Sequence, residues 1–160
     1  MSRAKTVPYE IRWAVPEDWQ ETMEMIWRTF LRFEASDYTA EGVANFRDFI
    51  TDGRIYRMFL EGTYLMMVAL DQGKIIGQIS VRNRNHISLL FVDEAYHKKG
   101  VGRELVSSMG EYLKKEKNEL FMSVKAAPYA VGFYRRTGFH ICSPEEEFSG
   151  IRVTSMEKFL

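Results

Sequence analysis

The apolar residues near the beginning of this chain follow a helical period. From Trp19 to Phe30 they recur at spacings of three and four, which predicts an amphipathic helix. The preceding Pro16-Glu17-Asp18 favours a helix start, because proline is tolerated in the first turn and carboxylates are stabilised at the positive helix end. A second helix is predicted between Thr39, a good N-cap, and Asp52-Gly53, where glycine ends it. A short strand, Glu10 to Ala14, is predicted before both helices.

The middle of the chain has the composition of β-strands. Tyr64 to Leu70 and Lys74 to Val81 are rich in β-formers, and Gly73 lies in the turn between them, so this region is predicted to form a hairpin. Ile87 to Val92 is predicted as a third strand, which completes an antiparallel meander. The segment from Arg54 to Glu61, before the hairpin, has no clean period of either kind, and no element is assigned to it.

The helical period returns in the last third of the chain. Apolar residues from Val101 to Leu113 predict a long helix that begins near Gly100 and ends in the cationic stretch Lys114 to Lys117. Shorter elements follow it. They are a strand from Leu120 to Val124, a helix from Tyr129 to Arg136, a strand from Phe139 to Cys142 and a strand from Ile151 to Leu160. No repeat or linker interrupts the pattern, so residues 1–160 are predicted to form one domain.

Composition and charge exclude several functions. The 22 Lys and Arg residues balance 22 Asp and Glu residues, so no overall field would recruit nucleic acid. No apolar run approaches the ~20 residues of a membrane helix, so no membrane partner is expected. The N-terminus lacks the apolar core of a signal peptide and Cys142 is the sole cysteine, so a reducing cytoplasm is expected. His86, His97 and His140 have no metal-site spacing, so no metal is expected.

The segment from Leu89 to Leu105 carries the most chemical information. A strand ends there, a polar loop with Lys98 and Lys99 follows, and Gly100-Val101-Gly102 opens the long helix. The first amides of a helix have no partner within it and carry partial positive charge, while glycine lets an anion approach, so the pattern favours phosphate binding. It is neither a Walker loop nor a dinucleotide fingerprint, because no Gly-Lys-Ser/Thr ends it and no third glycine follows. An ordinary tight turn is the alternative.

Two motifs resemble the GNAT superfamily of acyl-CoA N-acyltransferases. HISLLFVDEAYHKKGVGREL is similar to that family's main acyl-CoA motif, a strand followed by Q/R-x-x-G-x-G/A, with Gly100 and Gly102 on the two small positions. AAPYAVGFYRRTGF, from Ala126 to Phe139, is similar to the second motif, in which an aromatic-Tyr pair precedes Gly-Phe. The Arg12 to Asp18 opening, the meander and the closing VTSMEKFL follow the family's order of elements, so the resemblance covers essentially the whole chain.

This resemblance implies a single-domain α/β fold of the α+β type. Its sheet would be twisted, mixed and mostly antiparallel, with six to seven strands and about four flanking helices, and it would be splayed between the fourth and fifth strands. Acetyl-CoA, the implied acyl donor, would lie in that opening. The strand backbone would pair with the pantetheine arm and the loop amides would wrap the pyrophosphate. The residues implied to contact the cofactor are Leu90, Phe91, Val92, His97, Lys98, Lys99, Gly100, Val101, Gly102, Arg103 and Phe133.

The implied reaction is direct transfer of an acetyl group to a primary amine in a ternary complex. Tyr134 matches the family's frequent general acid, which protonates the departing CoA thiolate, and a backbone N–H near Val92 would meet the oxyanion. An alkylamine has a pKa near ~10 and must lose a proton before it attacks. The predicted fourth and fifth strands contain no carboxylate for this task, although family members often place a glutamate there. His86, or a water held by Ser88 or Ser123, is the alternative base.

Two positions depart from the family pattern: His97 stands where Gln or Arg is usual, and Ala127 where many members have an asparagine that bonds the cofactor arm. The acceptor, a small-molecule or peptide amine, is expected between the first two helices and the late strands. The residues expected near it are Trp27, Phe30, Phe33, Tyr38, His86 and Met156. Glu145 to Glu147 would either draw a cationic amine or form a solvated loop, and the loop is favoured.

Three further questions stay open at the level of sequence. The chain could be a non-catalytic acyl-CoA sensor or interaction module, because it lacks the strand glutamate and the asparagine at Ala127. It could also be a small domain with an anion-binding turn and no CoA. A homodimer remains an alternative to a monomer.

Overall fold

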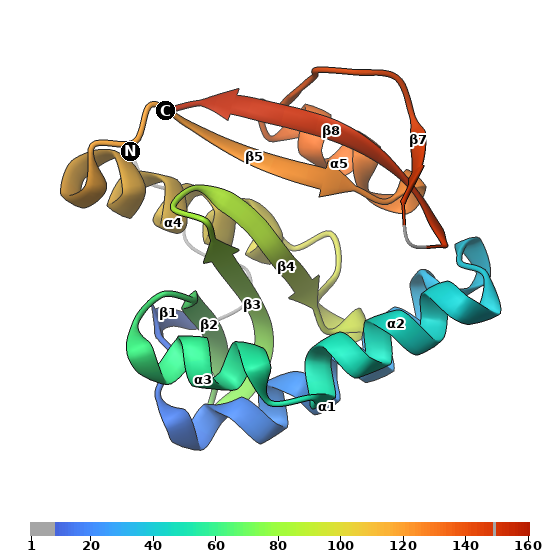
Figure 1. The fold of residues 1–160 in the computed structure, drawn as a ribbon. Helices are drawn as coiled ribbons and strands as arrows, with labels where there is room; N and C mark the ends of the chain where they lie inside the picture. Colours follow the sequence, from blue (N-terminus) through green and yellow to red (C-terminus); the bar gives the residue numbers. More distant parts are fainter. Residues whose placement is uncertain (1–8, 149) are drawn as a thin grey trace.

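One twisted sheet with helices on both faces organises the chain in the computed structural model, which describes residues 9–148 and 150–160 (Figure 1). The strands are β1 (Glu10–Trp13), β2 (Leu65–Asp71), β3 (Lys74–Arg82), β4 (His86–Val92), β5 (Phe121–Ala126), β6 (His140–Ile141), β7 (Glu146–Phe148) and β8 (Ile151–Phe159). The α-helices are α1 (Trp19–Phe33), α2 (Ala40–Thr51), α3 (Arg54–Glu61), α4 (Val101–Lys117) and α5 (Val131–Arg136). Short 3-10 turns are η1 (Pro16–Asp18), η2 (Ala35–Asp37), η3 (Glu94–Tyr96) and η4 (Pro128–Ala130).

The sheet opens between β4 and β5, as the resemblance to the GNAT superfamily implies. Its strand order is β1-β2-β3-β4-β5-β8-β6, with β7 paired to β8. The β4–β5 pair is parallel and the other pairs are antiparallel, so the mixed α/β fold class is confirmed. Register partners join β4 to β5 only at His86↔Ser123 and Ile87↔Val124, although β4 continues to Val92. Figure 1 shows the two strands diverging beyond this point.

A β-bulge in β4 lies where the two strands begin to separate. Ser80 of β3 pairs with Leu89, and the next residue, Val81, pairs with Ile87, which leaves Ser88 as an extra residue in β4. A bulge bends its strand and increases the local twist. The bend therefore accompanies the separation of β4 from β5.

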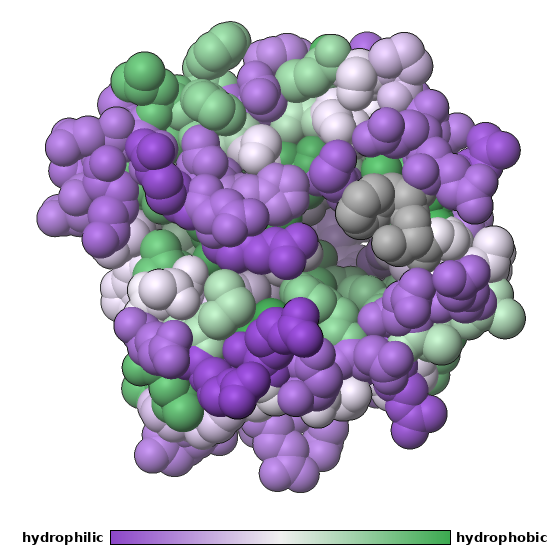
Figure 2. Space-filling model, in the orientation of Figure 1, coloured by the Kyte–Doolittle hydropathy of each residue, from purple (hydrophilic) through white to green (hydrophobic). Residues whose placement is uncertain are grey.

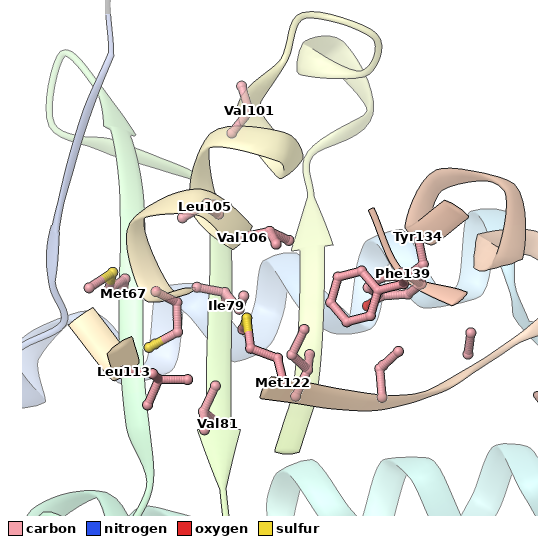
Figure 3. Close-up of a cluster of buried hydrophobic side chains, with 14 of the residues drawn as sticks. Met67, Ile79, Val81, Val101, Leu105, Val106, Leu113, Met122, Tyr134 and Phe139 are labelled. Atoms are coloured by element: carbon pink, nitrogen blue, oxygen red, sulfur yellow. The ribbon is translucent and has the colours of Figure 1, made fainter. Parts of the chain in front are cut away.

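Two apolar clusters, one on each face of the sheet, hold the helices in place. The cluster under α4 includes Leu105, Met109 and Leu113, which pack on Ile79 and Met122 of the sheet (Figure 3). The cluster under α1, α2 and α3 is centred on fully buried residues such as Ile26 and Phe30. The sheet is thus covered on both sides, and its opening lies between the two layers.

The predicted helix signals are confirmed, and one unassigned segment is a helix. Thr39 caps α2, because its side-chain oxygen accepts a 3.0 Å hydrogen bond from the Gly42 amide. The segment without a clean period forms α3, between Gly53 at φ 83° and Gly62 at φ 85°. Its two turns are too short to display a helical period, and glycine supplies the left-handed conformation at both ends.

The interpretation of Glu145 to Glu147 as a solvated loop is wrong in part. Backbone pairing of β7 with β8 places Glu146 and Glu147 in a strand, although both side chains remain exposed. Glu146 lies 3.5 Å from the ammonium group of Lys125, and Glu145 lies 3.0 Å from the guanidinium of Arg152. With β7 the described residues contain eight strands, more than the six to seven expected, and five α-helices rather than about four. None of the helices in the described ranges has the length and apolar character to span a lipid bilayer.

Candidate active site

The unpaired side of β4 borders a cavity of about 750 Å³, within the range of ~300–1,000 Å³ typical of small-molecule sites. We call it the cofactor cavity. Figure 2 shows the molecule hollowed between its β5–β8 part and its α1–α2 part. The cavity lies between the end of α1, the end of β4, the β4–α4 loop and α5. Its walls are formed by Thr29, Phe33, Glu34, Leu90, Phe91, Val92, Tyr96, His97, Lys98, Gly100, Val101, Gly102, Arg103, Tyr129, Ala130, Phe133, Tyr134, Arg136 and Thr137.

Most of the residues implied to contact the cofactor meet in this cavity. Ten of the eleven line it, and the exception is the exposed Lys99. Beyond Ile87 the backbone of β4 has no strand partner on its β5 side. Backbone groups left open in this way can pair with the amides of an extended ligand, as an added strand would.

The start of α4 has the geometry of an anion cradle. Gly100 is the N-cap at φ 84°, and Lys98 before it also takes a positive φ of 61°. A Cβ at Gly100 would meet nothing within 4 Å, so the backbone is open to a ligand there, and the first amides of α4 have no partner within the helix. Lys98, Arg103 and Arg136 add positive charge around the opening. Free amides, an accessible backbone and nearby cations together fit a diphosphate group.

The glycine at 102 serves packing within the same cradle. A Cβ at this position would lie 3.1 Å from two ring atoms of Phe133. That spacing is tighter than ordinary van der Waals contact, so glycine lets the ring of α5 approach the first turn of α4. Arg103 donates a 3.3 Å hydrogen bond to the carbonyl of Arg136 and joins the same two helices.

His97 turns toward β4 and not toward the diphosphate cradle. Its Nε2 lies 2.6 Å from the carbonyl oxygen of Val92, so this ring nitrogen carries the hydrogen and donates it. The ring centroid of Phe33 lies 4.8 Å from the imidazole and 5.7 Å from the ring of Tyr129. Phe33, expected near the acceptor, therefore covers the loop that leads to the cradle.

Tyr134 lines the cofactor cavity from α5. The side chain is 5% exposed and its ring packs edge-on against Phe133 and Phe139, as Figure 3 shows for the second contact. Within the described residues the hydroxyl has no hydrogen-bond partner. Burial and, to a smaller extent, the charge of Glu34 raise the pKa of Tyr134 well above its ordinary value. The phenol is thus protonated at neutral pH and able to donate.

Glu34, like Arg136, is a charged cavity residue that sequence analysis missed. It is the C-cap of α1 and lines the cavity opposite α5. Its carboxylate makes no hydrogen bond or ion pair with any other described residue. Burial, together with the negative charge of Asp37, raises the pKa of Glu34 to about 7. The only sequence signal was a carboxylate in the connection between the first two helices, and no local motif marks it.

The bases considered from sequence are bonded elsewhere. His86 lies on the last paired rung of β4 and β5, where its Nδ1 is 2.8 Å from the Ser123 hydroxyl. Burial, followed by the positive charges of Arg82 and Lys125, lowers the pKa of His86 to about 4. Ser88 accepts a 3.0 Å hydrogen bond from the hydroxyl of Tyr64. None of His86, Ser88 and Ser123 lines the cofactor cavity.

The residues expected near the acceptor are mostly used for packing. Phe30 and Met156 are 0% exposed, so neither offers a surface to an acceptor. Phe30 stacks on Phe46 at 4.1 Å, and Trp27 stacks on Phe30 at 5.6 Å. Tyr38 meets the edge of Phe30 at 4.9 Å. Of the six expected residues, Phe33 is the one that lines the cofactor cavity.

Within residues 9–148 and 150–160, one group of potential metal-ligand side chains comes together. His140, Cys142 and Glu157 place potential ligand atoms within 4.8 Å of one another on the β6–β8 surface, and His140 and Cys142 are exposed. None of the three lines the cofactor cavity. The expectation that no metal takes part stays a prediction.

The splayed sheet, the free amides at the start of α4 and the nearby tyrosine are the features that the GNAT resemblance implied. Comparison with protein families matches residues 34–160 to a model described as an acetyltransferase (GNAT) domain. The chain belongs to the GNAT acetyltransferase family, as the resemblance implied. Membership supports acetyltransferase activity in general. A comparison with curated proteins finds no match.

Solved structures with the same fold include several GNAT proteins. A GCN5-related N-acetyltransferase from Rhodopseudomonas palustris aligns with a TM-score of 0.83 at 23% identity and covers 100% of both chains. PaiA N-acetyltransferase from Thermoplasma acidophilum, in complex with coenzyme A, aligns with a TM-score of 0.79 at 21% identity over 96% of this chain and 100% of its own. A GNAT acetyltransferase from Staphylococcus aureus aligns at 0.74 with 16% identity, over 95% and 99%. At these identities the similarity shows the shared fold.

Proposed function

We propose that this protein is an N-acetyltransferase that moves an acetyl group from acetyl-CoA to a primary amine by direct attack in a ternary complex. The observation that carries this proposal is the cofactor cavity, where an anion cradle and a protonated tyrosine share one opening of the sheet. Family membership and the coenzyme A bound to PaiA support the donor. The acceptor is a small-molecule or peptide amine.

In this proposal the α4 end of the cavity holds the diphosphate of the donor. The first amides of α4 bind its oxygens, and Lys98, Arg103 and Arg136 balance its charge. The unpaired backbone of β4 binds the extended arm and directs the thioester toward Tyr134. Ala127, which is 8% exposed, provides no side-chain hydrogen bond to that arm, so backbone groups supply its polar contacts.

Tyr134 acts in this scheme as the general acid for the departing thiolate. The thiolate needs a proton as the C–S bond breaks, and the Tyr134 hydroxyl has no competing partner among the described residues. A backbone N–H near Val92 stabilises the oxyanion, a role worth ~3 kcal/mol when such a donor is lost. We also propose a cytoplasmic location, since the exposed Cys142 is a free thiol that a reducing compartment would maintain.

Calorimetry with acetyl-CoA tests the donor site. We expect saturable binding to the wild type and three- to tenfold weaker binding to Arg103→Ala, because one cation at the cradle is lost. Lys114→Ala is the matched control, since this exposed cation lies at the other end of α4, and its affinity should stay within twofold. No heat and no thermal shift with acetyl-CoA would contradict the proposal.

Thiol release tests transfer. With acetyl-CoA and a panel of alkylamines, diamines, triamines and peptides with a free N-terminus, at least one amine should release CoA and yield the N-acetyl product by mass spectrometry. Tight acetyl-CoA binding without transfer to any amine would instead favour the non-catalytic sensor.

A further inference from the structure

Glu34 and Tyr134 line the same cofactor cavity from two different helices. Glu34 ends α1, Tyr134 lies in α5, and Leu90 and Phe91 of β4 line the same cavity. Glu34 is close enough for its charge to act on the phenol. The cavity along the unpaired end of β4, where the thioester is proposed to lie, therefore contains both a carboxylate residue and a proton donor.

Neither polar group is satisfied by the protein. Within the described ranges, no hydrogen bond or ion pair reaches the Glu34 carboxylate or the Tyr134 hydroxyl. Burying an unpaired carboxylate costs free energy unless a proton or a cation accompanies it. Other buried or half-buried carboxylates of this chain do have partners: Asp93 pairs with Arg28 at 2.7 Å and Glu119 pairs with Arg84 at 3.0 Å. Glu34 therefore has the environment of a group that works on a ligand.

We propose that Glu34 is the general base of the acetyl transfer, binding the ammonium group of the acceptor and removing its proton. This inference rests on the proposed transferase function. It assigns to the end of α1 the task that no carboxylate of β4 or β5 can perform.

The proton affinity of Glu34 suits this task. Its pKa of about 7 comes first from burial and then from Asp37, and a base near the working pH is the most effective. The α1 C-terminus, which is the negative end of the helix dipole, acts in the same direction. The titratable and charged groups around it are Asp37 and Tyr38 after α1, Tyr129, Tyr134 and Arg136 around α5, and Tyr96, His97, Lys98 and Arg103 between β4 and α4.

Glu34 and Tyr134 together account for every proton that moves during the transfer. Glu34 takes one proton from the ammonium nitrogen, and the freed lone pair forms the C–N bond with the acetyl carbonyl carbon. The C–S bond breaks with its electron pair on sulfur, and Tyr134 gives its hydroxyl proton to that sulfur. The second nitrogen proton passes to the Tyr134 phenolate, and Glu34 returns its own to solvent. One proton is released for each amide formed.

The charge of Glu34 also affects the acidity of Tyr134 in a direction that favours the reaction. The negative charge of Glu34 is one of the two causes that raise the pKa of Tyr134. When Glu34 accepts the proton of the amine, this charge disappears and the phenol becomes more acidic. Deprotonation of the acceptor thus favours protonation of the leaving group.

A direct measurement of the Glu34 side chain tests the base without any turnover. In the CoA-bound protein, the ¹³Cδ resonance that disappears in Glu34→Gln should titrate within one unit of pH 7. In Asp37→Asn its midpoint should move to lower pH, because one nearby negative charge is removed. A midpoint near the ordinary glutamate value of ~4.3 would overturn the proposal.

Kinetics separate a base from a structural role. With the best amine of the panel, Glu34→Gln should lower kcat about a hundredfold or more, keep the Kd for acetyl-CoA within threefold, and lose the limb of the kcat/KM profile near pH 7. Glu34→Asp should restore part of the rate. Glu24→Gln, an exposed residue of the same helix, should match the wild type. Trifluoroethylamine, largely unprotonated at pH 7, should lose much less rate in Glu34→Gln than ethylamine.

The outcomes distinguish this inference from the proposed function. If the wild type fails to bind acetyl-CoA, or binds it and acetylates no amine, the proposed function fails and Glu34 has no proton to remove. If the wild type transfers acetyl groups and Glu34→Gln keeps both its rate and its pH profile, the transferase function stands and the assignment of Glu34 is wrong.

Discussion

The two ends of β4 differ in how their polar side chains are satisfied. At the paired end, His86 bonds Ser123, and Tyr64 bonds both Ser80 and Ser88. At the open end, Glu34 and Tyr134 face the cofactor cavity and have no partner among the described residues. The paired end therefore resembles an ordinary protein interior, whereas the polar groups at the open end are able to form hydrogen bonds with a ligand.

This contrast separates structural polar groups from reactive ones better than residue type does. Histidine is the commonest general base, yet burial lowers the pKa of His86 to about 4 and a serine occupies its Nδ1. Glutamate is ordinarily a weak base at neutral pH, yet the pKa of Glu34 rises to about 7. Both shifts follow from burial, which opposes charge on either side chain.

Blocking the open end should have the largest effect. In Gly102→Val the new side chain would collide with Phe133, and overpacking of this kind costs ~1–3 kcal/mol. Because the collision displaces the first turn of α4, which carries the donor amides, we expect a loss of binding free energy of similar size, about a 5- to 150-fold increase in the Kd for acetyl-CoA. Ser107→Val, at an exposed position further along α4, should leave the Kd unchanged. Calorimetry measures both, and equal affinities would show that the first turn of α4 is not the donor site.

Removing the proton donor should have the next largest effect. Tyr134→Phe should lower kcat tenfold or more and keep the Kd for acetyl-CoA within threefold, because the ring and its packing remain. Tyr112→Phe is the control and should keep the wild-type rate. Tyr112 belongs to α4, contacts Trp13 of β1 and does not line the cavity. An unchanged kcat in Tyr134→Phe would remove the acid role from this residue.

The ionisation of Glu34 should appear in the stability of the ligand-free protein. Its folded pKa of about 7 lies above its unfolded value of ~4.3, so the folded state binds the proton more tightly and loses stability as pH rises between these values. Between pH 4 and 8 the free energy of unfolding should therefore fall by roughly 1–3 kcal/mol less in Glu34→Gln than in the wild type, since each unit of pKa is worth ~1.4 kcal/mol. Urea unfolding at both pH values measures it, and an identical pH dependence in the two proteins would contradict the assigned pKa.

Changes at the paired end should have the smallest effect on catalysis. His86→Gln should reduce kcat less than threefold and leave the pH profile in place, because His86 lies outside the cavity and is neutral at pH 7. A tenfold or larger loss of kcat, or the loss of one limb of the pH profile, would instead indicate that the general base lies at this end of β4.

Sequence could predict the parts of the site whose residues all lie in one continuous segment of the chain. The strand from Ile87 to Val92, the glycine at 100 and the helix after it are neighbours in the chain, and the free amides of a helix N-terminus favour an anion. The helix caps at Thr39 and Gly53 are local for the same reason. Local sequence is therefore sufficient to predict the strand, the glycine N-cap and the helix on which the proposed donor site is built.

Glu34 and β7 could not be predicted, because both depend on partners far along the chain. Glu34 acquires its properties from burial in the wall of the cofactor cavity, and nothing in its own segment reports that burial. The acidic run before Phe148 has no strand alternation and becomes β7 because β8 offers an edge to pair with. Phe30, conversely, looked available in sequence and is enclosed by Phe46 and Tyr38.

The central claim is that acetyl-CoA lies along the open end of β4 with its diphosphate on the first turn of α4. Titration of ¹⁵N-labelled protein with acetyl-CoA, followed by amide NMR, tests it residue by residue. We expect the largest shifts at the amides of residues 98–103 and 90–92, and small shifts at His86 and Ser123. Saturable binding that shifts amides elsewhere and leaves residues 98–103 unmoved would contradict it.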